Sequence, residues 1–181
     1  MALSSQSFAS DIRASFDIGY GGMGATSTTG SQRNEGPIVF ALGADYSFDP
    51  RIAIGIEERR SYDLNLGSLV GVTNLLSRWY FITPQPSSSL LNDKTSLVQK
   101  NISPYLMGAV GLMQASIASR NLALESDINM IGMSITGAVG AEYQVWQNAG
   151  LRLELGFGQT ALGSTGTGQL LYFNLGAYLC L

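Results

Sequence analysis

A long alternation of apolar and polar side chains between Asn129 and Phe157 constrains this chain more than any other feature. One parity is apolar, at Ile131, Met133, Ile135, Val139, Ala141, Tyr143, Val145, Leu151, Leu153, Leu155 and Phe157. The other parity holds charged residues, small polar residues and glycine. Because successive side chains point to opposite faces only in a β-strand, the pattern predicts a hairpin with one apolar and one polar, glycine-rich face.

Such a hairpin fits two classes of protein. A soluble sandwich or barrel turns the apolar face inward, whereas a membrane barrel turns it outward and keeps the charges in its interior. Charged residues make up only 13% of the chain, about half of the roughly 25% of a typical soluble domain. This favours the membrane barrel, while the soluble barrel with a polar exterior stays open as the alternative.

Length, charge and the distribution of apolar residues exclude several other classes of protein. The 181 residues are sufficient for one domain. The net charge of −3, without a basic block, argues against nucleic-acid binding. The absence of a run of 18 apolar residues argues against a transmembrane helix. The start, MALSSQSFASD, lacks the segments of a signal peptide, so we expect a mature form to which Met1 was added.

The same alternation predicts eight strands in all. They span 11–22, 37–48, 51–59, 70–83, 102–115, the two arms of the 129–157 hairpin, and 169–181. Polar, glycine-rich stretches predict loops at 22–36, 60–69, 117–128 and 161–168, with a long polar connection at 84–101 and a flexible lead-in at 1–10. Short and long connections alternate, as in an all-β, eight-stranded antiparallel up-and-down barrel formed by residues 11–181.

Ten charged residues of the predicted strands are assigned to the lumen. Five are basic and five acidic: Arg13, Asp17, Asp45, Arg51, Glu57, Arg59, Arg78, Glu142, Arg152 and Glu154. Nine of them lie on the polar parity of their strands as the alternation gives it. For the strand at 70–83 the alternation is weaker, and its inward face is chosen as the one that contains Arg78. An eight-stranded barrel has room for little beyond side chains, and an unpaired buried charge costs several kcal/mol. The sequence therefore predicts a salt-bridge network that fills the lumen.

Aromatic residues divide between the two faces. Six of them end apolar faces, as an interfacial girdle requires: Tyr46, Phe48, Trp79, Phe81, Tyr143 and Trp146. Three tyrosines, Tyr105, Tyr172 and Tyr178, share the polar parity. They could line a ligand pocket, but we favour the interpretation that they fill the lumen with hydroxyls bonded to charges.

The pattern resembles the family of small outer-membrane β-barrels, the OmpA-like eight-stranded transmembrane domain and its relatives. The resemblance rests on SFDPR (47–51), SRWYF (77–81), SPYLMGAVG (103–111) and AEYQVWQNAGLRLELGFG (141–158). It implies insertion into a Gram-negative outer membrane by the barrel-assembly machinery, contact with lipopolysaccharide, periplasmic short turns and extracellular long loops.

Sequence signals for catalysis are weak. The chain has no histidine, which argues against histidine-dependent triads and metal sites. Glu142 and Glu154 could form an acid–base pair, but Arg152 shares their face and favours a salt bridge. The glycines of GYGGMG (19–24) do not open a helix as a dinucleotide site would. The sequence contains a single cysteine, Cys180, which rules out an intramolecular disulfide. We therefore expect no enzyme activity, cofactor or metal.

The sequence thus predicts a monomeric or weakly associating outer-membrane barrel with a plugged lumen, in a structural role or in recognition through its loops. Two alternatives remain at this point. One is a narrow channel for ions or small solutes. The other is a soluble, lipocalin-like barrel whose apolar face holds a ligand.

Overall fold

The computed structural model describes residues 11–27, 30–49, 51–62, 69–82, 102–117, 128–146, 149–162 and 166–181. The predicted lead-in at 1–10 and the connection at 84–101 lie outside the described residues. Eight strands are present: β1 Asp11–Ser27, β2 Gly30–Asp49, β3 Ile52–Tyr62, β4 Leu69–Tyr80, β5 Ile102–Ile117, β6 Ile128–Trp146, β7 Ala149–Leu162 and β8 Gly166–Cys180.

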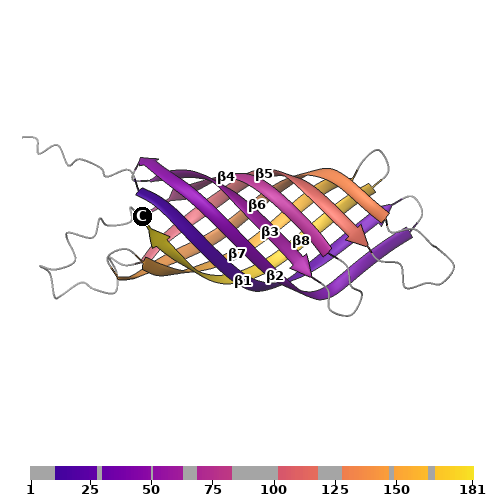
Figure 1. Ribbon diagram of the computed structural model, residues 1–181, viewed down its shortest axis with the longest axis horizontal. Helices are drawn as coiled ribbons and strands as arrows, with labels where there is room; N and C mark the ends of the chain where they lie inside the picture. Colours follow the sequence, from indigo (N-terminus) through magenta and orange to yellow (C-terminus); the bar gives the residue numbers. More distant parts are fainter. Residues whose placement is uncertain are drawn as a thin grey trace, which may run out of the picture.

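The strands form one closed barrel in which each pairs with its neighbours in sequence and β8 pairs back onto β1 (Figure 1). Every pairing is antiparallel. The predicted eight-stranded up-and-down barrel is therefore confirmed. β1 begins and β8 ends at the same end of the barrel, which we call the terminal rim. The opposite end, where β1 turns into β2, is the loop rim.

The pairing register fixes the tilt of the strands. Following the paired residues from Arg13 once around the barrel leads back to β1 at Met23, ten residues farther along. In an eight-stranded barrel this stagger corresponds to strands tilted by about 35–45° from the barrel axis. The tilt is visible in Figure 1.

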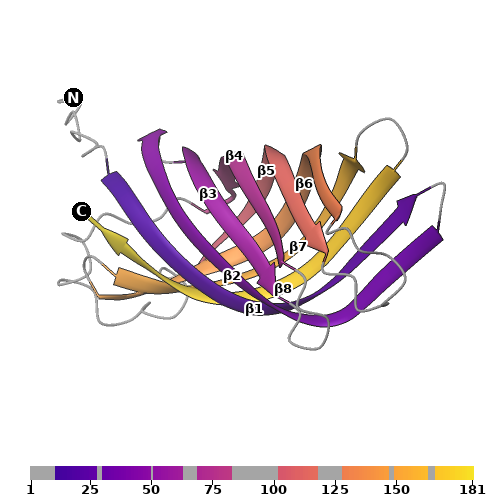
Figure 2. The ribbon, with the colours of Figure 1, turned by 45° about the vertical axis from the view of Figure 1, so that its right-hand side comes forward.

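The predicted loop at 22–36 is wrong. β1 and β2 remain paired from Gly22 opposite Glu35 to Ser27 opposite Gly30, after a shift of register that follows Tyr20. Figure 2 shows this long hairpin at the loop rim. Backbone pairing thus continues past the point where the apolar alternation ends, and loss of that alternation did not mark a turn.

The remaining loop predictions are shortened by the structure. β3 continues to Tyr62 and β4 begins at Leu69, so 63–68 of the predicted 60–69 loop are outside the described residues. The same holds for 118–127 of the predicted loop at 117–128 and for 163–165 of the predicted loop at 161–168.

Burial in this barrel is inverted relative to a soluble protein. Large apolar side chains cover the outer wall, with Ile135 71% exposed and Leu42 61% exposed, while Arg78 and Arg152 are each 1% exposed inside. The soluble alternative that holds a ligand on an apolar inner face is thereby wrong, because that face points outward. Among the described residues no helix has the length and apolarity needed to cross a membrane.

Candidate functional site

The interior of the barrel contains a single network of charged side chains. Nine of the ten predicted lumen charges are buried in it, each at most 4% exposed: Arg13, Asp17, Asp45, Glu57, Arg59, Arg78, Glu142, Arg152 and Glu154. They come from β1, β2, β3, β4, β6 and β7. Strand parity brings them inside, because each occupies a position between two residues that face outward.

Asp45 and Glu142 join the basic residues near the terminal rim. Asp45 pairs with Arg13 at 2.9 Å, with Arg78 at 2.5 Å and with Arg152 at 3.6 Å. Glu142 pairs with Arg13 at 3.0 Å and with Arg152 at 2.8 Å. The predicted salt bridge between Glu142 and Arg152 is present.

Arg59 and Glu57 extend the network toward the loop rim. Arg59 bridges Glu57 at 2.7 Å and Glu154 at 3.0 Å, and Glu57 lies 3.6 Å from Arg78. Asp17 completes it with one distant contact, 3.8 Å from Nη1 of Arg152. All nine charges are thus connected through shared partners. Five carboxylates face four guanidinium groups, so the network carries one excess negative charge when every group is ionised.

Four tyrosines pack the same space, one beside each arginine. The guanidinium carbon of Arg59 lies 3.5 Å from the ring centre of Tyr172. The other three pairs are Arg13 with Tyr80 at 5.1 Å, Arg78 with Tyr105 at 5.7 Å and Arg152 with Tyr178 at 5.9 Å. A cation over an aromatic ring is attracted by the ring quadrupole, most strongly where water is excluded.

Three tyrosine hydroxyls bond carboxylates that the arginines also hold. Tyr105 and Tyr172 donate to Glu154 at 2.8 and 3.0 Å, and Tyr80 donates to Glu142 at 3.1 Å. The prediction that Tyr105, Tyr172 and Tyr178 fill the lumen is therefore confirmed in position, and two of the three hydroxyls bond a charge. Tyr80 was not among the tyrosines predicted to fill the lumen; the available signal was that it shares the parity of Arg78 two residues earlier.

Glycines opposite the tyrosines make room for these rings. Tyr105, Tyr172 and Tyr178 are the cross-strand partners of Gly140, Gly156 and Gly150. A Cβ atom at any of these glycines would overlap the ring and hydroxyl of its tyrosine. The glycine-rich polar face predicted from sequence is thus the space into which the aromatic rings fold.

One predicted lumen charge is misplaced. Arg51 is exposed and belongs to the turn between β2 and β3, where its backbone N–H donates to Oδ1 of Asp49 at 2.8 Å. The prediction that Arg51 faces the lumen required the strand to begin at residue 51, whereas β3 begins at Ile52. A charge beside an Asp-Pro turn is better assigned to the rim, since the turn interrupts the alternation.

The six predicted girdle aromatics all face outward, and each is more than 40% exposed. They lie at or near the ends of β2, β4 and β6, so they gather at the terminal rim: Tyr46, Phe48, Trp79, Phe81, Tyr143 and Trp146. This is the position that an interfacial girdle requires.

The charges occupy only part of the lumen. Above Arg59 and Tyr172, toward the loop rim, the buried interior side chains of the described strands are uncharged: Val39, Ser61, Val70, Val72, Met113, Ser134, Thr160 and Leu170. Among the interior side chains that the structure describes, the charged ones therefore lie toward the terminal rim, in what we call the charged half of the lumen.

A second ion pair lies on the outer wall. Sequence analysis ended the third strand at 59, but β3 continues to Tyr62 and turns Glu58 and Arg60 outward. Nε of Arg60 lies 3.2 Å from Glu58, and the Thr73 hydroxyl donates to the same carboxylate at 2.5 Å. Pairing lowers the cost of exposing these charges beside apolar neighbours.

No cluster of three or more His, Cys, Asp or Glu side chains suited to a metal ion occurs among the described residues. The chemistry of the interior is therefore that of ion pairs and tyrosine hydroxyls.

Comparison with solved structures agrees with this architecture. Neisserial surface protein A aligns with a TM-score of 0.67 at 14% identity, over 93% of this chain and 96% of that one. The chain has the fold of the eight-stranded outer-membrane barrels. The N-terminal barrel of Pseudomonas aeruginosa OprF aligns over 92% and 97% of the two chains (TM-score 0.54, 14% identity). The attachment invasion locus protein Ail of Yersinia pestis aligns over 93% and 98% (0.52, 14%).

No family model matches the sequence, and no curated protein sequence matches it either. At 14% identity the similarity to these outer-membrane barrels establishes the fold, and the role has to be argued from the interior and the outer wall.

Proposed function

We propose that this protein is an integral outer-membrane barrel of the OmpA-like kind whose lumen is plugged by its own ion pairs, with a structural or loop-mediated surface role. The observation that carries the proposal is the inversion of the barrel: exposed apolar side chains outside and nine connected charges inside. An apolar wall of this extent is stable only where hydrocarbon covers it.

Support for a plugged lumen comes from how the side chains fill it. Arg78, Arg152, Tyr105 and Tyr172 are among the largest fully buried side chains. Arginines from β1, β3, β4 and β7 cross the lumen to carboxylates on other strands, as in the 3.0 Å contact between Arg13 and Glu142. A water-filled path would expose these groups, so we expect no steady current through the resting barrel.

Support for a non-enzymatic role is chemical. The chain contains no histidine, and each carboxylate near the centre of the lumen is held by arginines or tyrosines. Two of the similar structures carry names of surface proteins, Neisserial surface protein A and the attachment invasion locus protein. These names are consistent with a role at the loop rim, with the protein inserted as a monomer in contact with lipopolysaccharide.

The narrow channel is the second candidate function. It is favoured by the charged half of the lumen, whose excess carboxylate would select cations if the network opened. Both candidates are tested with detergent-refolded protein in a planar bilayer, with insertion checked by heat-dependent gel mobility. An inserted, silent barrel supports the plug; discrete conductance steps refute it and identify a channel; failure to insert refutes the membrane barrel.

A further inference from the structure

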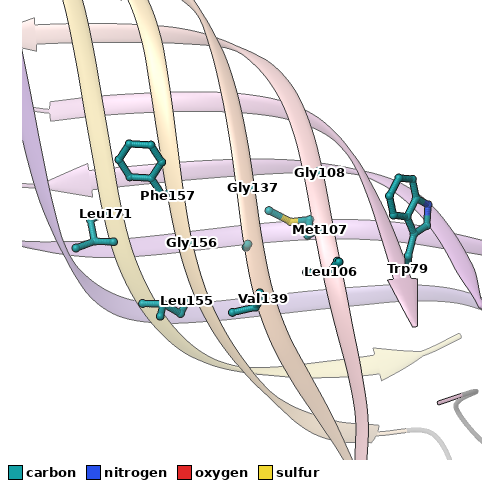
Figure 3. Close-up of a pocket in the computed structure, with 11 residues that line it drawn as sticks. Trp79, Leu106, Met107, Gly108, Gly137, Val139, Leu155, Gly156, Phe157 and Leu171 are labelled. Atoms are coloured by element: carbon teal, nitrogen blue, oxygen red, sulfur yellow. The ribbon is translucent and has the colours of Figure 1, made fainter. Parts of the chain in front are cut away.

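The outer wall of the barrel is interrupted by a groove. Its cavity volume is about 500 Å³, within the range of small-molecule sites, and its lining includes Trp79, Gly108, Gly137, Val139, Phe157 and Leu171. Figure 3 shows Gly137 and Gly108 between the Phe157 ring on one side and the Trp79 indole on the other. The lining side chains that point outward are apolar, so the groove has no ligand for an ion or a polar headgroup.

Small residues form the floor of this groove. Ser77, Gly108 and Gly137 are consecutive cross-strand partners on β4, β5 and β6, and the next partner is Phe157 on β7. A Cβ added at Gly108 would meet nothing within 4 Å, and one at Gly137 would meet only the carbonyl oxygen of Met107, at 4.0 Å. These two glycines are therefore not required by internal packing, unlike those beneath the lumen tyrosines.

The groove lies at the depth of hydrocarbon. Outward-facing residues of β6 run from Ile131 to Val145, and Gly137 is near the middle of that run. Phe157 and Leu171, which border the groove toward the loop rim, are also exposed apolar residues. If the barrel spans a membrane as proposed above, the groove contacts the interior of the bilayer and not its headgroups.

Groove width favours a chain over a protein surface. From Trp79 on β4 to Phe157 on β7 the lining crosses three inter-strand spacings of about 4.8 Å, so the groove is about 14 Å long. Its floor is formed where Gly108 and Gly137 each lack a side chain, so the groove is about one side chain wide. A second barrel would have to bring a matching ridge and bury about 800 Å² per partner. A flexible alkyl chain needs neither.

We propose that the groove over Gly108 and Gly137 is a binding site for one alkyl chain of a membrane lipid. This inference rests on the proposed membrane insertion. Between apolar surfaces in a bilayer, association is driven by van der Waals packing. A chain lying in the groove contacts protein on its floor and both sides, whereas a chain against the flat wall contacts protein on one side, and each lost pair of atoms weakens its hold.

Trp79 reports on occupancy of the groove. The chain has two tryptophans, so Trp146→Phe leaves Trp79 as the only indole. In phosphatidylcholine vesicles titrated with a chain-brominated fatty acid, quenching of Trp79 measures how strongly the adjacent site takes up that single chain relative to the bulk bilayer. We expect an apparent preference of about threefold over the bulk lipid.

Filling the groove should abolish this preference. Gly108→Val/Gly137→Val adds side chains where the structure has open space, so the barrel should still fold. Ala44→Val/Ala177→Val is the matched control, because both alanines are exposed outward-facing residues outside the groove. Loss of the preference in the glycine variant and its retention in the alanine variant would support the site.

Other outcomes overturn the inference. Equal quenching in the native and filled barrels means that no chain prefers the groove. A crosslinked dimer that forms in vesicles and disappears in the glycine variant makes a second copy the occupant. Insertion is measured separately by heat-dependent gel mobility, so failure to insert refutes the proposed function and the inference together, whereas an inserted barrel without the preference refutes the inference alone.

Discussion

Replacing a buried lumen carboxylate by its amide should lower the stability of the barrel strongly at Glu142 and hardly at all at Asp17. Glu142 accepts four hydrogen bonds, from Arg13, from Tyr80 and from Nε and Nη2 of Arg152, at 2.8–3.1 Å. Asp17 has one ion pair among the described residues, at 3.8 Å from Arg152. Glu142→Gln and Asp17→Asn each replace a carboxylate by its amide of the same size, and each removes the excess negative charge of the network.

Their effects on stability should therefore differ through local contacts alone. Glu142→Gln removes the charge that holds Arg13 and Arg152 and points an amide N–H toward one of them, and breaking a buried ion pair costs about 3–5 kcal/mol. Asp17→Asn removes one distant contact and relieves repulsion from the other carboxylates, so we expect a change within about 1 kcal/mol of the native protein.

Urea titration in lipid vesicles measures the difference. The folded fraction is read from gel mobility without boiling, and an m-value of about 1–3 kcal/mol/M converts the expected loss for Glu142→Gln into a midpoint lower by roughly 1–5 M. Asp17→Asn should leave the midpoint nearly unchanged. No loss for Glu142→Gln would show that the lumen is hydrated enough to screen these pairs and would refute the plugged interior, whereas equal losses for both variants would refute the argument from local contacts.

Five further substitutions test the remaining features. Gly156→Ala should destabilise the barrel by about 1–3 kcal/mol because a methyl group overlaps the Tyr172 ring, whereas Gly108→Ala, which meets open space, should not in the same titration. Tyr172→Phe removes a hydrogen bond to a buried carboxylate and should cost about 1–3 kcal/mol by urea midpoint. Arg51→Ala, at an exposed turn, should change the free energy of unfolding by no more than about 0.5 kcal/mol, and a larger loss would show that Arg51 takes part in the network. Arg59→Met should lower the free energy of unfolding by about 3–5 kcal/mol, because it leaves Glu57 and Glu154 without this partner.

Strand parity accounts for most of what the sequence predicted correctly. Within a strand, the face of a residue follows from the face of its neighbour, so Arg13, Asp45 and Glu154 could be assigned to the interior from their own segments. The prediction for Arg51 was wrong because this residue lies at a strand end. Alternation of faces holds only within a strand, so an error of one residue in the boundary leaves the direction of the side chain undetermined. Arg60 lay outside the predicted strand for the converse reason, because the charges there were interpreted as the end of a strand that in fact continues to Tyr62.

Pairing inside the lumen could not be predicted from parity. Which carboxylate meets which arginine depends on the stagger of the strands and on the heights at which side chains reach across the barrel. Glu142 and Glu154 share a face of one hairpin, yet Arg13 and Arg152 hold the first and Arg59 holds the second. The alkyl-chain groove was equally hidden, since Gly108 and Gly137 become neighbours only through the pairing of β5 with β6.

The network also depends on closure of the barrel. Arg13 on β1 reaches Asp45 on the adjacent strand, but its second partner, Glu142, is 129 residues away on β6, and Arg59 reaches Glu154 across 95 residues. Neither long-range pair can form in an open sheet, because both cross the lumen. A buried charge left unpaired is strongly unfavourable, so partly closed barrels are destabilised relative to the closed one. The same side chains that fill the lumen therefore make closure of β1 onto β8 cooperative, which explains why a surface-like set of charges is kept inside an apolar wall.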